Sequence, residues 1–399
     1  MKNLRTLKLL ITIAMLGLAA VVCVLSGQAQ REDAESSQAS SEEIESSDAE
    51  KSLGQRDRGK RLFERETFGG NGRTCLTCHS NATGTVSPED ARQRLALNPH
   101  DPLFVHDGSD DGQGNGVTRM LADATVLVNV PLHPNVSLAD DPEARSVTLR
   151  RGIPTTLDTP ALDPVLMLDG RDPDLKAQAL GAIRNHFQNT AEPSERQLQR
   201  IAEFQQTRSF FSSPELRRFA RGGPAPELPE GYTESEKRGR LFFEDVPLTS
   251  PTQKAGSCAV CHSGPMLNRT NRFLPFPLPP GSRFQNIFVS EFNAAGNPVR
   301  DFIFTNPDGS QTVVTSTDPG RALITGDARS PLFDSLNAFK IPSLWGVQRT
   351  APYFHDNSAK TLQQVTAHYA QFFRIISNQS LILTEQDQAD IVAYLKLLN

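Results

Sequence analysis

The feature that most constrains this chain is the pattern Cys-x-x-Cys-His, which occurs at residues 75–79 and again at residues 258–262. Two thiols at this spacing can bond the two vinyl groups of one porphyrin, and the adjoining imidazole can bind its iron. A disulfide would leave the histidines unexplained, and a zinc site would lack ligands because Cys23, in an apolar N-terminal run, is the only other cysteine. We therefore predict two covalently bound haem c groups, attached and proximally ligated by Cys75, Cys78, His79, Cys258, Cys261 and His262.

The sequence just before each motif is repeated. Residues 58–64 and 238–244 read Arg-Gly-Lys-Arg-Leu-Phe-Glu and Arg-Gly-Arg-Leu-Phe-Phe-Glu, about 180 residues apart, which is the length of a domain. A chain of 399 residues also suits two domains of ordinary size. We predict a mostly α-helical fold with long loops and a small β-hairpin, built from two cytochrome c-like domains that each surround one haem. The domains span residues 53–221 and 233–399, and the Pro- and Gly-rich residues 222–232 link them.

Local signals place several helices and one hairpin. A Ser or Thr followed three residues later by Gln, Glu or Asp marks a helix start, because the two residues can cap each other's backbone amides. This pattern begins at Ser52, Ser194, Thr233, Thr361 and Thr384. The helices after Ser194, Thr361 and Thr384 should run to about residues 209, 373 and 398. Apolar residues on both sides of Asp308-Gly309 predict the hairpin. The span 80–164 has few helix signals, and we expect long loops there, since a porphyrin supplies part of the core.

The N-terminus reads as an export signal. Three basic residues precede an apolar run over residues 9–25, and small residues predict cleavage after Ala29. Retention of the run as a membrane anchor is the second interpretation, and lipidation of Cys23 is the third. We assign residues 1–29 to the signal peptide and the Ser- and Glu-rich residues 30–52 to a disordered acidic linker. We expect a periplasmic protein that contacts a membrane only through such an anchor, and its net charge of −5 gives no indication of nucleic-acid binding.

Segments outside these motifs resemble the bacterial di-haem cytochrome c peroxidase and MauG family. The most specific are Phe339–Leu344 and Thr350–Asp356, which match the family's Lys-x-Pro-Ser-Leu and Pro-Tyr-Phe-His-Asp runs. The others include Pro154–Leu157, Asp169–Arg171 and Asp318–Arg321. The resemblance covers nearly all of residues 53–399. It implies one haem that passes electrons and one with an open iron face where peroxide is reduced.

For the second haem, the resemblance implies a further iron ligand fourteen residues after the histidine of the Pro-Tyr-Phe-His-Asp run, which is Tyr369. Family peroxidases have methionine there, and MauG-like members have tyrosine. An anionic phenolate stabilises oxidised iron, so it should lower the potential by a substantial part of the roughly 0.8 V that axial ligands span. His368 is the rival ligand, and ordinary core packing is the alternative role for Tyr369.

For the first haem, the resemblance implies that Arg171 and Gln178 line the distal pocket. The stretch that supplies a movable distal histidine in the peroxidases has none here, which suits an open iron. The family's carboxylate for O–O cleavage falls at Gln188, which cannot exchange a proton as a carboxylate does. His186 or Glu192 could replace it.

Two aromatic positions also depart from the family. Leu168 stands where a tryptophan usually lies between the haems, so electron exchange between them should be slower or differently routed. Trp345 stands where an arginine is usual, and it either stacks near the second haem or fills core.

The resemblance further implies a calcium ion. Its ligands would be backbone oxygens at Thr350 and Pro352 and a side-chain oxygen at Asp158, where the family has asparagine. A second acidic segment, residues 107–112, begins like a calcium loop but has Thr118 at the place of the usual glutamate. We interpret that segment as a solvated loop.

The leading hypothesis is a di-haem oxidoreductase. It would take electrons from a small donor cytochrome or cupredoxin at the second haem and reduce hydrogen peroxide or a related oxidant at the first. Gln188 and Leu168 favour an alternative, a pure electron-transfer cytochrome. Tyr369 favours a third hypothesis, MauG-like oxidation of a protein substrate.

Overall fold

A computed structural model describes residue 54 and residues 56–273 and 278–399 of the chain. The predicted signal peptide, the acidic linker and the capping pattern at Ser52 lie outside these residues. Residues 59–399 form one compact unit. Within the described part of the chain, no helix combines the length and the apolar character that crossing a lipid bilayer requires.

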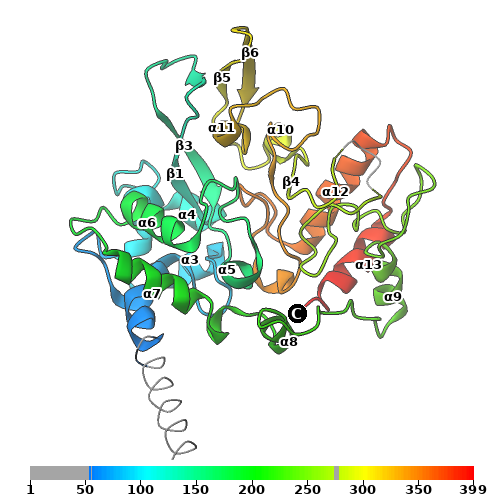
Figure 1. The fold of residues 1–399 in the computed structure, drawn as a ribbon, viewed down its shortest axis with the longest axis horizontal. Coiled ribbons are helices and arrows are strands. Elements are labelled where there is room, and N and C mark those ends of the chain that lie inside the picture. The colour runs from blue at the N-terminus through cyan, green and yellow to red at the C-terminus, as the bar shows by residue number, and fades with distance from the viewer. Residues whose placement is uncertain (1–53, 55, 274–277) are drawn as a thin grey trace, which may run out of the picture. The chain divides into compact units, whose positions relative to one another are not determined.

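The first half of this unit combines short helices with three strands (Figure 1). Residues 59–65 are helical. The following elements are α2 (Cys75–Cys78), α3 (Pro88–Leu97), η1 (Pro102–Phe104), η2 (His106–Gly108), α4 (Thr118–Asp123), β1 (Thr125–Pro131), β2 (Val136–Leu138), β3 (Ser146–Gly152), α5 (Thr159–Leu162), α6 (Leu175–His186), α7 (Glu195–Gln205), η3 (Arg208–Phe210) and α8 (Pro214–Phe219).

The second half ends in its two longest helices, which lie side by side (Figure 1). Its elements are α9 (Glu234–Leu241), β4 (Phe284–Gln285), α10 (Val289–Phe292), β5 (Arg300–Thr305), β6 (Gln311–Ser316), α11 (Ala322–Thr325), β7 (Phe339–Lys340), η4 (Val347–Arg349), α12 (Leu362–Ile376) and α13 (Glu385–Leu395).

Four of the predicted helix starts are confirmed. In each, the hydroxyl of the N-cap residue accepts a hydrogen bond from the backbone amide three positions on, which satisfies an amide that the helix itself leaves unpaired. The N-caps are Ser194 for α7, Thr233 for α9, Thr361 for α12 and Thr384 for α13. The predicted ends of α7, α12 and α13 lie three or four residues from those observed.

The predicted hairpin is confirmed and belongs to a larger sheet. β5 and β6 pair antiparallel, from Arg300 opposite Ser316 to Thr305 opposite Gln311. The free edge of β5 pairs with β2 from the first half of the chain, which gives the strand order β2-β5-β6.

The expectation of long loops over residues 80–164 is wrong for much of that span. It contains α3, α4 and the strands β1–β3, and β1 pairs antiparallel with β3 from Thr125 opposite Gly152. β1 does show a strand signal, since Val126, Val128 and Val130 alternate along it and are buried. Its partner, however, lies across a long connection without a tight-turn signal, so the pairing could not be read from neighbouring residues.

Three clusters of buried apolar side chains form the core. One lies within residues 62–210 and another within residues 216–398. The third combines residues 86–153 with residues 302–323, beneath the shared sheet. The two halves of the sequence therefore pack together through a common core, whereas the predicted boundaries of the two domains remain a prediction.

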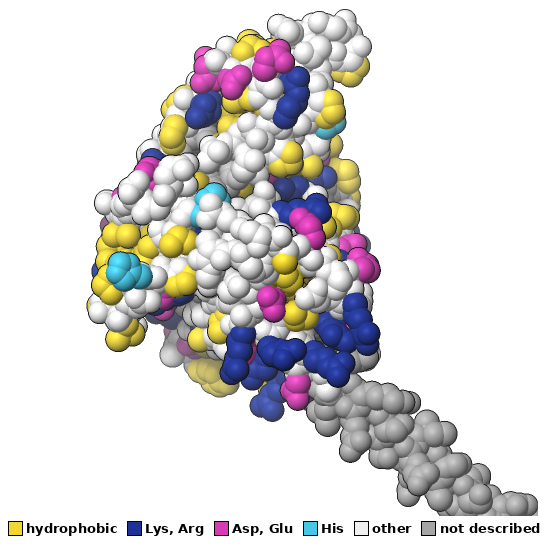
Figure 2. Space-filling model, turned by 90° about the vertical axis from the view of Figure 1, so that its left-hand side faces the viewer, with side chains coloured by type: hydrophobic (Ala, Val, Ile, Leu, Met, Phe, Trp, Pro, Cys, Tyr) yellow, Lys and Arg dark blue, Asp and Glu magenta, His cyan; other side chains and the backbone are white. Residues whose placement is uncertain are grey.

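One surface region is basic. Figure 2 shows Lys and Arg side chains gathered on part of the face that it presents. Exposed basic residues of the helical stretch 59–65 and of α7 include Lys60, Arg61, Arg65 and Arg196. Positive charge is thus concentrated locally on a chain whose net charge is −5.

Candidate functional site

The second Cys-x-x-Cys-His motif borders a cavity of about 270 Å³. Cys258, Cys261 and His262 all line it. Nδ1 of His262 lies 2.8 Å from the carbonyl oxygen of Leu267. Because a carbonyl only accepts, Nδ1 carries the proton in this pair, and Nε2 is the nitrogen that could bind a metal. Burial lowers the pKa of His262 to about 4, so the imidazole is neutral, as a ligand must be.

The cysteines of both motifs are free thiols, so the disulfide considered for each pair is not formed. Burial raises the pKa of Cys75, Cys258 and Cys261 to about 12 and also raises the pKa of Cys78. Such thiols are neutral and behave as small apolar groups until they are chemically attached. Over the described ranges, no three or more His, Cys, Asp or Glu side chains form a group that could hold a metal ion.

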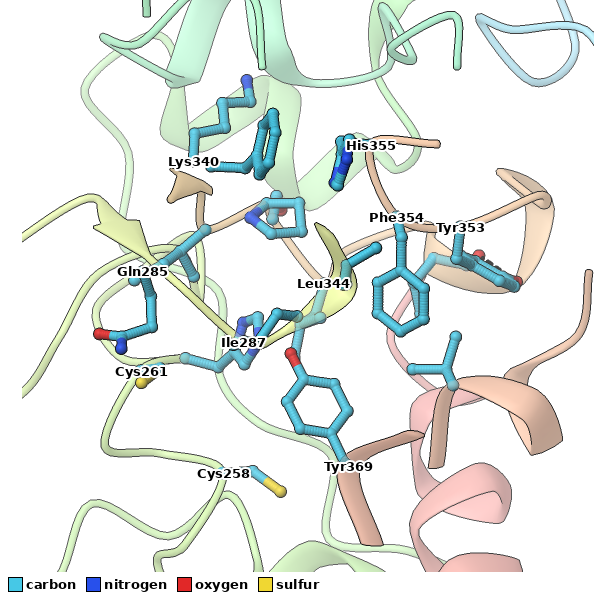
Figure 3. A pocket seen from close by; sticks show the side chains of 18 of the residues that line it. Cys258, Cys261, Gln285, Ile287, Lys340, Leu344, Tyr353, Phe354, His355 and Tyr369 are labelled. Carbon is cyan, nitrogen blue, oxygen red and sulfur yellow. Dashed lines mark hydrogen bonds between the residues drawn. The ribbon is translucent and has the colours of Figure 1, made fainter. Parts of the chain in front are cut away.

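Helix α12 forms one wall of this second cavity with residues at helical spacing. They are Leu362, Val365, Thr366, Tyr369, Phe372, Phe373 and Ile376. The Tyr369 hydroxyl points into the cavity (Figure 3), and burial raises its pKa. His368 is not among the lining residues, because Nε2 of its ring lies 2.8 Å from the Ile287 carbonyl oxygen. The structure therefore places Tyr369, and not its rival, at the cavity wall.

The buried polar atoms without a hydrogen-bond partner at this second cavity include Nε2 of His355 and Oε1 of Gln285 (both residues are labelled in Figure 3). The Phe339 ring stacks on the His355 ring with centroids 3.7 Å apart, which fixes its orientation. An unpartnered buried polar group costs about 1–3 kcal/mol. The cavity therefore fits an occupant that has a broad apolar body and polar groups at its edge, and a haem is such a group.

The first motif borders a smaller cavity of about 100 Å³. Cys78 and His79 line it, and Cys75 packs at the edge of the apolar cluster formed within residues 62–210. Nδ1 of His79 lies 2.8 Å from the Gly84 carbonyl oxygen, and burial lowers the pKa of this histidine. His79 is therefore presented in the same way as the histidine of the second motif, with Nε2 available to a metal.

Helix α6 lines the first cavity with a stripe of residues, Leu175, Gln178, Ala182 and His186. Arg171 also lines it, so the structure brings the predicted Arg171 and Gln178 together. Gln188 does not join them. The helix ends at His186, the backbone then turns with φ of 51° at Gln188, and the exposed side chain accepts a hydrogen bond from Nδ2 of Asn71 at 3.2 Å. A count of ten positions from Gln178 along the sequence takes no account of this turn, so it does not show where the Gln188 side chain lies.

A buried ion-pair network fixes Arg171. Nη1 of Arg171 lies 2.9 Å from Oδ2 of Asp169, which also pairs with Arg151. Nε of Arg151 lies 2.7 Å from Oδ2 of Asp318. Burial alone would raise the pKa of Asp169, but the charges of Arg151 and Arg171 hold it below its usual range. Since Asp318 belongs to the second half of the chain, both halves position Arg171.

The two cavities share part of one wall. The residues that line both are Gly152, Ile153, Pro154, Thr155, Thr159, Leu168 and Lys340. Nζ of Lys340 lies 3.0 Å from Oδ2 of Asp163, and this ion pair stabilises the Lys340 ammonium group in the shared wall. Trp345 lines only the second cavity, where its Nε1 donates to the Pro265 carbonyl oxygen at 2.8 Å.

Asp158, a predicted calcium ligand, and Arg349, which precedes the predicted ligand Thr350, both bind Ser212. Oδ1 of Asp158 accepts a hydrogen bond from the Ser212 amide at 2.8 Å, and Oδ2 is buried without a partner. Arg349, next to Thr350, donates to the Ser212 carbonyl oxygen at 2.9 Å. Burial raises the pKa of Asp158 to about 6. A free carboxylate oxygen beside the segment that holds Thr350 and Pro352 fits a cation, although no ion is needed to explain the rest of the packing.

The other acidic segment, residues 107–112, has its carboxylates engaged by protein donors. Asp111 accepts from the amides of Gln113 and Asn115. Asp107 pairs with Arg73 and with His186. Sequence reasoning read this segment as a solvated loop and missed that Asp107 reaches the first cavity through His186.

No protein-family model matches the chain. Cytochrome c551 peroxidase of Nitrosomonas europaea is 25% identical over 61% of this chain and 64% of its own length. Cytochrome c peroxidase of Escherichia coli is 26% identical over 62% of this chain and 40% of its own length. The match thus spans less than two thirds of either relative. A solved MauG-like protein associated with microbial copper homeostasis is 20% identical, with 86% of this chain and 88% of that chain covered and a TM-score of 0.48. The two sequence relatives are bacterial cytochrome c peroxidases, and they confirm the resemblance to such peroxidases that the motifs predict.

Proposed function

We propose that the protein is a di-haem c-type oxidoreductase that takes electrons from a small redox protein and reduces hydrogen peroxide or a related peroxide. The observation that carries this proposal is the difference between two adjoining cavities that start from the same motif. Both are largely apolar, but the first adds the guanidinium of Arg171, the amide of Gln178 and the imidazole of His186, whereas the second adds the hydroxyl of Tyr369 from α12.

In this proposal each haem is bonded through one cysteine pair and ligated by Nε2 of His79 or His262. Bound haem supplies electron storage and, where one axial position stays open, a place for peroxide to be activated. Arg171 and Gln178 hold the peroxide oxygens by donating hydrogen bonds, and the charge of Arg171 stabilises negative charge on the leaving oxygen. Tyr369 would be a further ligand of the iron of the other haem and would leave no place for peroxide there.

The direction of electron flow follows from these roles. A small donor cytochrome or cupredoxin delivers electrons at the second cavity, and they cross the shared wall at Leu168 to the first. We place this reaction in the periplasm, where the N-terminal sequence would deliver the protein. Calcium at Asp158, Thr350 and Pro352 would stiffen the segment between the two cavities.

The experiment is a characterisation of the mature protein made with a competent haem-attachment system. The mass should exceed that of the polypeptide by two porphyrins, the pyridine haemochrome spectrum should show c-type haem, and EPR of the ferric protein should show one high-spin and one low-spin iron. The protein should also oxidise a reduced donor cytochrome when peroxide is added. Two six-coordinate haems that bind neither peroxide nor cyanide would instead support a pure electron-transfer cytochrome. That alternative is favoured by Leu168, in place of a tryptophan, and by Gln188, which is exposed and is not a carboxylate.

A further inference from the structure

The first cavity contains a polar group that lies outside the family motifs. His186 ends α6 and lines the cavity together with His79, Arg171 and Gln178. Its Nδ1 lies 2.5 Å from Oδ2 of Asp107. Since the carboxylate accepts, Nδ1 carries a proton, and Nε2 is the ring nitrogen left free in a side chain that faces the cavity.

Asp107 is rigidly held beside this imidazole. Only 4% of Asp107 is exposed, and it pairs with Arg73, of which 1% is exposed. Burial would raise the pKa of Asp107, but the hydrogen bond from His186 and the charge of Arg73 hold it below its usual range. Asp107 is therefore a carboxylate. Arg73 also donates to the carbonyl oxygens of Leu103 and Val105, which anchors the loop on which Asp107 lies.

Other groups that could exchange a proton lie elsewhere. Glu192 forms an exposed ion pair with Arg184 at 3.0 Å, and it does not line the cavity. Gln188 is exposed and bonded to Asn71. Among the described residues that line the first cavity there is no carboxylate, and His186 is the only histidine besides His79.

We propose that His186 is the proton-transfer residue of the first cavity and that Asp107, anchored by Arg73, is its positioning residue. This inference rests on the proposed function. A carboxylate that accepts the Nδ1 proton fixes the imidazole tautomer and supports the positive charge that appears when Nε2 takes up a second proton. Nε2 accepts a proton from one oxygen of hydrogen peroxide and delivers it to the other oxygen, which leaves as water when the O–O bond breaks. Two electrons from the donor protein and two protons from solvent complete the conversion of one hydrogen peroxide into two waters.

The test compares the holoprotein with His186→Gln and His106→Gln. The second variant is the matched control, because His106 lies next to Asp107 on η2 but does not line the cavity. With His186→Gln, kcat for peroxide should fall by about 10²–10⁴-fold, while KM for the donor protein stays the same. The rate at which cyanide binds the ferric protein should fall as well, because hydrogen cyanide must lose its proton as it binds. His106→Gln should change neither quantity.

Asp107→Asn tests the positioning role. It should lower kcat and the rate of cyanide binding without changing KM for the donor, and Asp107→Glu should restore part of the loss. Should Asp107→Asn fail to fold because Arg73 loses its partner, His186→Gln decides alone. Wild-type peroxide turnover and wild-type cyanide binding in His186→Gln would overturn the inference. If the wild-type protein binds cyanide but consumes no peroxide, the proposed function fails, and the cyanide rates still decide whether His186 transfers protons.

Discussion

The two cavities begin with the same Cys-x-x-Cys-His pattern and share part of one wall, but different helices complete them. At both, the histidine binds a backbone carbonyl oxygen through Nδ1 at 2.8 Å. Around His79, however, α6 contributes Gln178 and His186, and a buried network contributes Arg171. Around His262, α12 contributes Tyr369 and a row of apolar side chains. In the proposed function, the motif therefore specifies where a cofactor is attached, and the helix that faces it decides which chemistry is available.

The largest expected effect comes from removing one attachment site at a time. Cys75→Ala with Cys78→Ala should leave one covalent haem and abolish peroxide consumption, because in the proposed function Tyr369 leaves the remaining haem no place for peroxide. Cys258→Ala with Cys261→Ala should also leave one haem, but this protein should still bind cyanide while it no longer accepts electrons from the donor. Mass spectrometry, cyanide titration and donor oxidation measure these outcomes. Peroxide turnover that survives in the first double variant would show that the roles of the cavities are assigned the wrong way round.

A smaller but selective effect is expected at the second cavity alone. If Tyr369 ligates the second haem as the proposed function requires, Tyr369→Met replaces an oxygen ligand by a thioether, which should raise the midpoint potential of that haem by a substantial part of the roughly 0.8 V that axial ligands span. Spectroelectrochemical titration measures this potential. Tyr353→Phe is the matched control, since Tyr353 lines the same cavity but its hydroxyl donates to the Val347 carbonyl oxygen at 3.0 Å. Equal potentials in Tyr369→Met and wild type would mean that Tyr369 only packs.

The buried network that holds Arg171 should matter for stability. Asp318→Asn leaves Arg151 without one of its two carboxylates, and losing one partner of a buried ion pair costs about 3–5 kcal/mol in the free energy of unfolding. Glu215→Gln, which breaks an exposed pair with Arg218, should cost less than about 1 kcal/mol. Urea unfolding of the holoprotein at neutral pH measures both. Similar values for the two variants would mean that the network does not couple the halves of the chain.

The same network predicts a pH dependence. The pKa of Asp169 lies below its usual value of 3.8 in the folded protein, because the charges of Arg151 and Arg171 outweigh burial. A carboxylate whose pKa is lower when folded stabilises the fold above its unfolded pKa, and this contribution is lost as the pH falls below about 4. The free energy of unfolding should therefore drop in that range, and the drop should be smaller in Arg151→Met, where the main partner is missing.

Residues close in sequence could be predicted, and those brought together by the fold could not. The capping patterns at Thr233 and Thr384 and the hairpin at Asp308-Gly309 are local, and the structure has them as predicted. Gln188 does not line the cavity, because α6 ends two residues earlier and the backbone changes direction there. The sequence has no Gly or Pro at this point that would have predicted the helix end.

The pair of Asp107 and His186 is a contact made by the fold that the sequence could not predict. The two residues are 79 positions apart, and each has an ordinary local interpretation, in an acidic loop and at a helix end. The two residues form a hydrogen-bonded pair at a cavity only because η2 packs against the end of α6. Arg73 stabilises this packing by donating hydrogen bonds to the carbonyl oxygens of Pro102 and His186. The network between Arg151 and Asp318 likewise joins two halves of the chain that the sequence treats as separate domains.

The smallest predicted effect concerns a calcium ion that we predict at Asp158, Thr350 and Pro352. If Asp158 is a ligand, calcium at one hundred times its Kd should add about 2.7 kcal/mol to the free energy of unfolding, and a chelator should remove this gain. Asp158→Ala should abolish the response, because Oδ2 of Asp158 is the buried carboxylate oxygen without a partner. Asp111→Ala is the control, since that carboxylate is already engaged by the amides of Gln113 and Asn115 and should leave the calcium response intact. A response that disappears in Asp111→Ala and persists in Asp158→Ala would move the ion to the loop, away from both cavities, and would remove calcium from any role in joining them.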